Sequence, residues 1–364
     1  MKSENKDLKR TSLYEIHKQY GAKLVGFAGF EMPIVYSSII DEHKCVRDSV
    51  GVFDVSHMGE FIFRGENALD QIQLLTVNDA SKLEVGRVQY SAMCYPEGGI
   101  VDDLLVYRFS NHYMMVVNGA CKDKDFEWVQ QSLIENASLE DQSDDITLLA
   151  VQGPESRNVV QKICETDISD LKYYRAFNGK IAGMPAIISR TGYTGELGFE
   201  LYFDNEYAVD IWKAVFDAGE EFGIKPIGLG ARDSLRLEKN MHLYGNDITR
   251  DTNPIEAGLG WITKLDKCDF IGKEALAAVK DKGPARKLVS FVAEGRSVPR
   301  HGYNLLYDGE VVGEVTSGGF SPILSKGIGM GYVSADVSAI GTKIAIDIRG
   351  KENPAEIIKP PFVG

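Results

Sequence analysis

The chain has 364 residues, which is enough for two or three packed units. Its composition is that of an ordinary globular protein, and a net charge of −13 argues against a nucleic-acid partner, which calls for clustered lysine and arginine. No apolar run approaches the ~20 residues of a membrane span, and the polar start at 1–10 lacks the apolar core of a signal peptide, so we expect a cytoplasmic protein with no membrane partner.

The cysteines are widely scattered, without a C-x-x-C pair or a cysteine–histidine spacing that suits zinc. We therefore expect no metal site and no disulfide framework. The pattern favours reduced, buried thiols in a cytosolic protein. They are Cys45, Cys94, Cys121, Cys164 and Cys268.

The first predicted elements are helices. Residues 12–20 have a short helical pattern, with Ser12 as the N-cap and Glu15 completing a capping box. A second helix is predicted over 38–50, with an apolar stripe from Ile39 to Val46.

After residue 51 the pattern changes to strands, with helices between them. The predicted elements are, in chain order, a strand at 52–58, a helix at 66–76, strands at 87–95, 100–109 and 113–117, and a helix at 122–136. The polar, acidic stretch 138–146 then indicates a connection between units.

The middle of the chain mixes both kinds of element. We predict a strand at 147–152, a helix from 154, strands at 180–188 and 198–203 around a glycine-rich turn, and helices at 205–222 and 229–240. The stretch 241–260 has few periodic signals, and irregular segments of that length are usually functional in compact proteins.

The tail differs in kind, because short strands with turn signals follow a linker at 282–285. Asp308-Gly309 between apolar runs predicts a hairpin with a primed turn. Closely spaced strands of this kind indicate a small antiparallel β-barrel. The strands are predicted at 286–293, 304–307, 310–316, 328–333, 343–349 and 355–358.

The segment 98–107 carries the most informative carboxylate. In a strand alternate residues share a face, so Asp103 lies with Val101, Leu105 and Tyr107, away from Asp102. An ionised carboxylate among such neighbours must be hydrogen-bonded, protonated or facing a cleft, and each of these shifts its pKa. Shifted carboxylates are enriched at functional sites. The alternative is that an aspartate anchors the Gly-Gly turn. We prefer that interpretation for Asp102, whereas the strand pattern leaves both open for Asp103.

The segment 189–200 contains three glycines, at 192, 195 and 198, which permit tight bends and close ligand approach. It lacks both the Lys-Ser/Thr pair of a phosphate loop and the G-x-G-x-x-G of a dinucleotide site. Glu200 enters the next strand beside Phe199, and a carboxylate next to aromatic rings suits a flat heterocycle with adjacent N–H donors. The alternative is a turn followed by an edge-strand acid.

Two further features are weaker. Gly228-Leu-Gly230 lacks the third glycine of a dinucleotide motif, while Arg232 in a first helical turn opposes the helix dipole, which favours a ligand or salt-bridge role. His57 has no metal partner nearby and cannot pair with Ser56 on the same strand face, so we interpret it as a satisfied structural histidine.

Several motifs together resemble the T-protein family of the glycine cleavage system, in family order from about residue 10 to the end. They are Phe53-Asp-Val-Ser-His-Met-Gly-Glu60, Gly98-Gly-Ile-Val-Asp-Asp-Leu104, Gln152-Gly-Pro154, Arg190-Thr-Gly-Tyr-Thr-Gly-Glu196, Gly228-Leu-Gly-Ala-Arg-Asp233, Asn253-Pro-Ile-Glu-Ala-Gly258, Ser317-Gly-Gly-Phe-Ser-Pro322 and Lys359-Pro-Pro-Phe362.

The resemblance implies an α+β, three-unit clover-leaf fold that binds folate, with ferredoxin-like subdomains and a C-terminal antiparallel β-barrel. Residues 1–281 would form the folate-binding aminomethyltransferase region. Within it, a discontinuous first unit would comprise about 1–50 and 138–281, and an inserted unit about 51–137. The barrel domain would comprise 286–364.

It also implies a reaction. The methylene of an aminomethyl group would pass from the lipoyl arm of H-protein to tetrahydrofolate as co-substrate. Ammonia would be released, and 5,10-methylenetetrahydrofolate formed. The second aspartate of the family's pair, here Asp103, would orient and activate the folate nitrogen, either as proton acceptor or as electrostatic partner.

The family's ligand-binding positions map onto further residues of this chain. Glu200 matches the acid that reads the pterin edge, through a bidentate contact with two N–H donors. The other matches are Met58, Tyr90, Asn118, Tyr193, Arg232 and Trp261.

Three alternative functions fit the sequence less well. A folate-dependent demethylase would lack the full set of motifs. The folate domain of a sarcosine-type dehydrogenase would accompany a flavin domain with a dinucleotide fingerprint, which is absent here. A non-catalytic folate-binding protein of iron–sulfur maintenance would carry a Lys-Gly-Cys-Tyr motif, which this sequence does not have. Dinucleotide binding at Gly228 fails on motif context.

Overall fold

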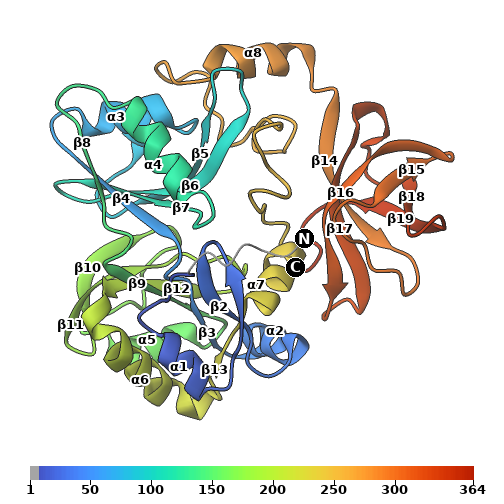
Figure 1. The fold of residues 1–364 in the computed structure, drawn as a ribbon. Coiled ribbons are helices and arrows are strands. Elements are labelled where there is room, and N and C mark those ends of the chain that lie inside the picture. The colour runs from blue at the N-terminus through green and yellow to red at the C-terminus, as the bar shows by residue number, and fades with distance from the viewer. Residues whose placement is uncertain (1–7) are drawn as a thin grey trace. The chain divides into compact units, whose positions relative to one another are not determined.

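The computed structural model describes residues 8–364, whose helices and strands are drawn in Figure 1. The chain divides into two compact units. Unit 1 comprises Met1–Ala68, Leu83–Gln89 and Leu105–Asp233, and unit 2 comprises Leu69–Lys82, Tyr90–Leu104 and Ser234–Gly364. Strands β5 (Val88–Cys94) and β6 (Ile100–Arg108) and helix α7 (Leu229–Glu238) each run from one unit into the other.

Unit 1 is built on a six-stranded sheet with the order β10-β11-β12-β9-β3-β13, antiparallel except for the β3–β13 pair. Its strands are β3 (Gly51–Asp54), β9 (Ile146–Gln152), β10 (Ala176–Ile181), β11 (Met184–Ser189), β12 (Gly198–Asp204) and β13 (Lys225–Pro226). Helices α5 (Ser156–Ile163) and α6 (Ala208–Gly219) pack on one face of this sheet (Figure 1).

The alternation of side chains along β12 explains the two faces of the sheet. Phe199 and Leu201 enter the core under the helices, where they pack with Trp212 of α6. Glu200 and Tyr202 therefore point to the opposite face.

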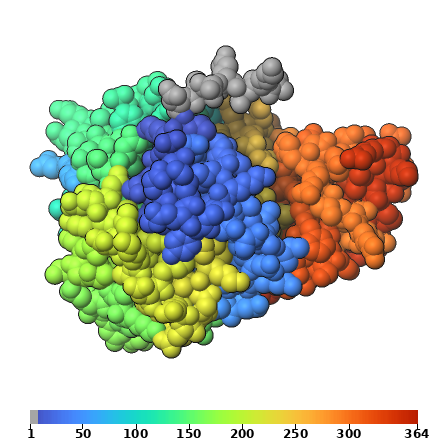
Figure 2. Space-filling model, turned by 60° about the horizontal axis from the view of Figure 1, so that its bottom comes forward, coloured from blue at the N-terminus to red at the C-terminus, as the bar shows by residue number. Residues whose placement is uncertain are grey.

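The N-terminal part of unit 1 comprises α1 (Tyr14–Gln19), β1 (Lys23–Phe27), β2 (Phe30–Val35) and α2 (Ile39–Asp48). Tyr20, directly after α1, makes ring contacts with Trp212 and Phe216 of α6 at 5.8 and 5.3 Å. In Figure 2 this blue segment accordingly lies side by side with the yellow-green surface of α6.

A five-stranded sheet has the order β5-β6-β7-β4-β8. Its remaining strands are β4 (Gly59–Arg64), β7 (Tyr113–Val117) and β8 (Ser138–Asp141), and the helices of this region are α3 (Ala68–Leu75) and α4 (Lys122–Gln131). Phe61 of β4 packs against Phe126 of α4 at 5.5 Å, so Glu60 and Ile62 point to the face away from α4.

Unit 2 contains the C-terminal half of α7, an irregular segment, α8 (Lys273–Lys282) and a closed antiparallel barrel with the order β14-β17-β16-β15-β18-β19. Phe291, Val315, Ile346 and Ile357 lie in the barrel core. Its strands are β14 (Arg286–Ala293), β15 (Asn304–Tyr307), β16 (Glu310–Ser321), β17 (Lys326–Ser334), β18 (Lys343–Asp347) and β19 (Glu352–Ile358).

The mixed α+β class and the C-terminal barrel are confirmed. So is the primed turn, since Asp308 and Gly309 both have positive φ, 50° and 83°. The irregular stretch 241–260 contains neither a helix nor a named strand. Among residues 8–364, none of the helices has the length and apolar character that crossing a membrane requires.

Four local predictions were wrong. Ser12 does not cap α1, because its hydroxyl bonds Thr147 Oγ1 at 2.6 Å instead. Ile39 lies 42% exposed, whereas α2 buries Glu42 in its place; this carboxylate accepts main-chain N–H bonds from 36, 37 and 228.

The stretch 138–146 is not merely a connection, because residues 138–141 form β8 on the edge of β4. The strand predicted over 180–188 is the hairpin of β10 and β11, which turns at Ala182 and Gly183 with φ of 49° and 82°. The sequence pattern missed this turn because Ala182 and Gly183 lie within a run of apolar residues at 181–188. The division of residues 1–281 into a discontinuous unit and an inserted unit stays a prediction.

Candidate functional site

Asp103 lies in the middle of β6, in the part of that strand that belongs to unit 2. The hydroxyl of Tyr90, on β5, donates a hydrogen bond of 2.9 Å to Asp103 Oδ2. The Tyr90 ring lies 6.1 Å from that of Trp261, at an interplanar angle of 30°. Trp261 is 65% exposed, so this group presents an aromatic surface to the outside.

The two neighbouring aspartates differ as strand alternation requires. Asp102 is completely buried, whereas Asp103 is half-buried. The turn before them is closed by main-chain bonds, from Tyr95 N to Gly99 O and from Gly98 N to Tyr95 O, both 2.8 Å. Of the states left open for Asp103, the structure shows the hydrogen-bonded one.

Glu200 is the centre of a second group, in unit 1. Its Oε2 accepts hydrogen bonds from the hydroxyl of Thr191 and, at 3.4 Å, from that of Tyr202. Tyr202 is also hydrogen-bonded to Tyr107 at 2.8 Å, and Ser189 to Thr191 at 2.8 Å. Since β12 is flanked by β11 and β9, the edge-strand alternative for Glu200 is wrong.

Both hydroxyl groups donate to the same oxygen, Glu200 Oε2, and thereby fix the orientation of the carboxylate. Burial raises the pKa of Glu200, while the bond from Thr191 and the charge of Arg232 act to lower it. The Arg232 guanidinium stacks over the Tyr193 ring, 4.6 Å from its centroid. These interactions bring Glu200, Arg232 and Tyr193 together in unit 1.

Met58 and Asn118 lie at the ends of paired strands in the same unit. Gly59 of β4 pairs with Val117 of β7, which places Met58 and Asn118 opposite each other just beyond the ladder. Both are half-buried.

His57 is buried, but it is not the satisfied histidine that the sequence indicated. Its Nδ1 has no hydrogen-bond partner among residues 8–364, and its ring packs edge-on against Phe27 at 5.3 Å. Burial, with the nearby charge of Arg232, lowers the pKa of His57 to about 4, so the ring is neutral at neutral pH.

Glu60 is a buried acid that the sequence reasoning did not select as a site residue. It is 1% exposed, and its Oε1 has no hydrogen-bond partner within the described part of the chain. Burial, the charge of Asp141 and the charge of Glu200 raise the pKa of Glu60 to about 8. Alternation with Phe61 places Glu60 on the opposite face of β4, and the local pattern does not reveal that this face is buried too.

At two glycines of the 189–200 turn, Gly192 and Gly198, the structure shows the close approach of a side chain. A Cβ on Gly192 or Gly198 would lie 2.0 or 2.3 Å from the side chain of Gln152. The Gln152 amide accepts a hydrogen bond from Thr194 Oγ1 at 2.9 Å and donates one to Thr191 O at 3.2 Å, so it links two residues of the turn. The close approach is therefore that of Gln152.

Close packing also explains the glycines at positions 228 and 230. A Cβ on Gly228 would lie 2.4 Å from the backbone of Ile34, and one on Gly230 would lie 2.7 Å from the Ile39 side chain. These contacts explain the glycine pair without a dinucleotide.

Comparisons with known proteins agree with this architecture of a mixed α+β region followed by a barrel. The family model described as GCVT N-terminal domain matches residues 13–267, and that of the glycine cleavage T-protein C-terminal barrel domain matches residues 286–364. The two matches define the class of protein, which is a glycine cleavage T-type protein that contains both the N-terminal domain and the C-terminal barrel domain.

Relatives of the same length are named aminomethyltransferase. One from Halothermothrix orenii is 48% identical over 98% of this chain and 100% of its own, and one from Porphyromonas gingivalis is 52% identical over 98% and 99%. The crystal structure of glycine cleavage system aminomethyltransferase T from Bartonella henselae has a TM-score of 0.92 and 33% identity, covering 98% of both chains. The chain therefore belongs to the glycine cleavage T-protein family of aminomethyltransferases.

Proposed function

We propose that this chain transfers the methylene of an aminomethyl group from the lipoyl arm of H-protein to tetrahydrofolate. Ammonia leaves, and 5,10-methylenetetrahydrofolate forms. The observation that carries the proposal is the half-buried carboxylate of Asp103, held by the Tyr90 hydroxyl in a chain that matches the T-protein family over nearly its whole length.

The proton balance of this reaction explains the need for such a group. Two N–C bonds form on folate, while the C–S and C–N bonds of the aminomethyl group break. The two N–H protons that folate loses end on the dihydrolipoyl sulfur and on ammonia. A carboxylate beside a folate nitrogen assists either by accepting a proton or by stabilising the positive charge that develops on nitrogen.

The Tyr90 hydroxyl supports both roles. A hydrogen bond to the ionised form of a carboxylate favours that form and fixes its orientation. This bond is made to Oδ2 of Asp103, and we assign the carboxylate as a whole to the folate nitrogen.

Tetrahydrofolate binding is assigned to the remaining residues. We assign Glu200 to the pterin edge, where a carboxylate and two adjacent N–H donors make a charge-assisted, bidentate contact. The hydroxyls of Thr191 and Tyr202 hold that carboxylate in place. The other proposed folate contacts are Met58, Tyr90, Asn118, Tyr193, Arg232 and Trp261.

A reconstituted assay tests the proposed function. Purified protein is supplied with aminomethylated lipoyl H-protein and tetrahydrofolate, and ammonia and methylenetetrahydrofolate are followed together. We expect the two products in equal amounts. Absence of turnover, with sulfonium or N-methyl donors accepted instead, would overturn the proposal in favour of a demethylase. Folate binding without any turnover would favour a non-catalytic folate-binding protein.

A further inference from the structure

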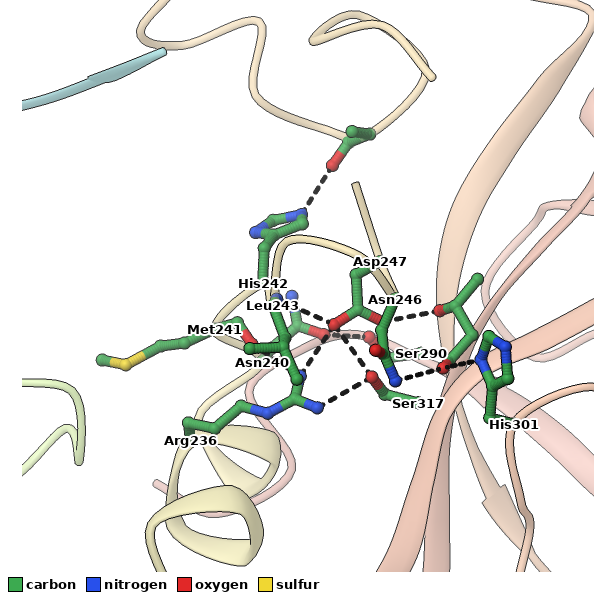
Figure 3. A network of polar contacts seen from close by, with 12 residues as sticks. Arg236, Asn240, Met241, His242, Leu243, Asn246, Asp247, Ser290, His301 and Ser317 are labelled. Carbon is green, nitrogen blue, oxygen red and sulfur yellow. Dashed lines mark hydrogen bonds and ion pairs between the residues drawn. The ribbon is translucent and has the colours of Figure 1, made fainter. Parts of the chain in front are cut away.

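The irregular segment 241–260, which we call the bracket segment, lies between α7 and Trp261 in unit 2. It has contacts in two directions within that unit: with the barrel strands and with the first residues of β6. Figure 3 shows its barrel side, where dashed lines join the Asp247 carboxylate to the Arg236 guanidinium and to Ser317.

On the barrel side, the bracket segment is held through Asp247, which is completely buried. Its Oδ2 accepts bonds from Arg236 Nη1 at 2.7 Å and Ser317 Oγ at 2.9 Å, and its Oδ1 accepts one from Thr316 Oγ1 at 2.6 Å. The hydroxyl of Tyr332 also donates to Asp247 O at 2.9 Å. Both carboxylate oxygens are thus satisfied, as a buried charge requires.

On the strand side, the bracket segment holds the first residue of β6. The Tyr244 hydroxyl donates to Ile100 O at 3.1 Å, and Ile100 N donates to Thr252 O at 2.9 Å. The contact with the turn before β6 is closer still, because a Cβ on Gly99 would lie 2.0 Å from Arg250 O. Only glycine permits this approach of two backbones.

Ile100 lies three positions before Asp103 on the same strand. A strand is stiff over so short a distance, so a shift of Ile100 is passed on to the Asp103 carboxylate. A misplacement of 1 Å at a reacting group can cost a large part of a catalysed rate. A buried ion pair such as Arg236–Asp247 adds little net stability, but it is favourable only in a well-defined geometry.

We propose that Asp247 is a positioning residue, through which the barrel fixes the bracket segment and thereby sets the position of Asp103. The inference rests on the proposed function, because it concerns the rate of methylene transfer. The barrel would thus influence the reaction through the bracket segment, without contacting the substrate.

The test removes single hydroxyl groups from each side of the bracket segment. Thr316→Val deletes the bond to Asp247 Oδ1, and Tyr244→Phe deletes the bond to Ile100 O. For each variant, kcat, the Kd of tetrahydrofolate by calorimetry and the unfolding midpoint are measured, with assays well below the lowest midpoint. Thr316→Ser, which keeps the hydroxyl, is the rescue variant, and Thr342→Val is the control for losing a barrel threonine elsewhere.

We expect kcat to fall about tenfold in Thr316→Val and in Tyr244→Phe, with the Kd changed less than about twofold. Thr316→Ser and Thr342→Val should keep the wild-type kcat. In a Tyr90→Phe background, in which the Asp103 carboxylate lacks the hydrogen bond from Tyr90, the further loss from Thr316→Val should be smaller, because both changes act through Asp103.

Three outcomes would overturn the inference: an unchanged kcat with a lowered unfolding midpoint, a weaker Kd with an unchanged kcat, or full additivity with Tyr90→Phe. The proposed function fails separately, since it requires turnover by the wild-type protein before any variant is compared.

Discussion

Replacement of Glu60 by glutamine should stabilise the folded protein, and more so as the pH rises. Glu60 is buried, and its raised pKa of about 8 exceeds the ordinary value of 4.5. Between these two pH values the folded state retains a proton that the unfolded state has released. The contribution of Glu60 to stability therefore falls as the pH rises from 4.5 to 8. Glutamine has a similar shape and no such proton.

The magnitude follows from the shift. One pKa unit corresponds to about 1.4 kcal/mol, so the advantage of the glutamine variant grows by about 2.7 kcal/mol between pH 5.5 and pH 7.5. The upper limit, above pH 8, is about 5 kcal/mol. An effect of this size is a large fraction of the ~5–15 kcal/mol stability of a typical domain.

Denaturant unfolding followed by circular dichroism at several pH values measures the difference between wild type and Glu60→Gln. Glu66→Gln is the control, because Glu66 is an exposed residue of the same region. A difference between wild type and Glu60→Gln that does not vary with pH would refute the reasoning, as would a wild type that is the more stable protein at pH 7.5.

Three further predictions concern other residues. Asp103→Asn should largely abolish methylene transfer in the H-protein assay while calorimetry still detects folate binding; near-normal turnover would contradict its assigned role. Glu200→Ala should weaken tetrahydrofolate binding about 10–100-fold, because two charge-assisted bonds are lost, and an unchanged Kd would count against the pterin-edge assignment. Lys267→Met should lower the free energy of unfolding by about 3–5 kcal/mol, because the buried ammonium donates to four oxygens of Gln73, Thr76 and Asn78. An unchanged denaturation midpoint would argue against this prediction.

The buried polar groups of segment 57–60 share one property, which is that burial favours their neutral forms. The pKa of His57 is lowered and that of Glu60 is raised, so both are uncharged near pH 7. Burial also raises the pKa of Glu200, although hydrogen bonds from Thr191 and Tyr202 and the charge of Arg232 act to lower it. The two acids differ in their hydrogen bonds, because Glu200 accepts from two hydroxyl groups, whereas Glu60 Oε1 has no partner among residues 8–364.

The sequence alone determined the features that depend on short-range periodicity. The alternation of residues 100–108 separates Asp103 from Asp102, and the structure confirms that one is half-buried and the other completely buried. The same local signals located the barrel strands and the primed turn at Asp308-Gly309. Family resemblance, carried by motifs in order along the chain, then selected Asp103 and Glu200.

Only the tertiary structure decided the partners of these residues, because each contact joins segments that are distant in sequence. Thr191 reaches Glu200 across a turn, and Tyr107 reaches Tyr202 across 95 positions. Asp247 meets Ser317 across 70 positions. No period of two or 3.6 residues encodes such pairs, because hydrogen-bond partners depend on how strands and loops pack. The bracket segment shows this most clearly, since it has no periodic pattern, and the barrel holds it in place.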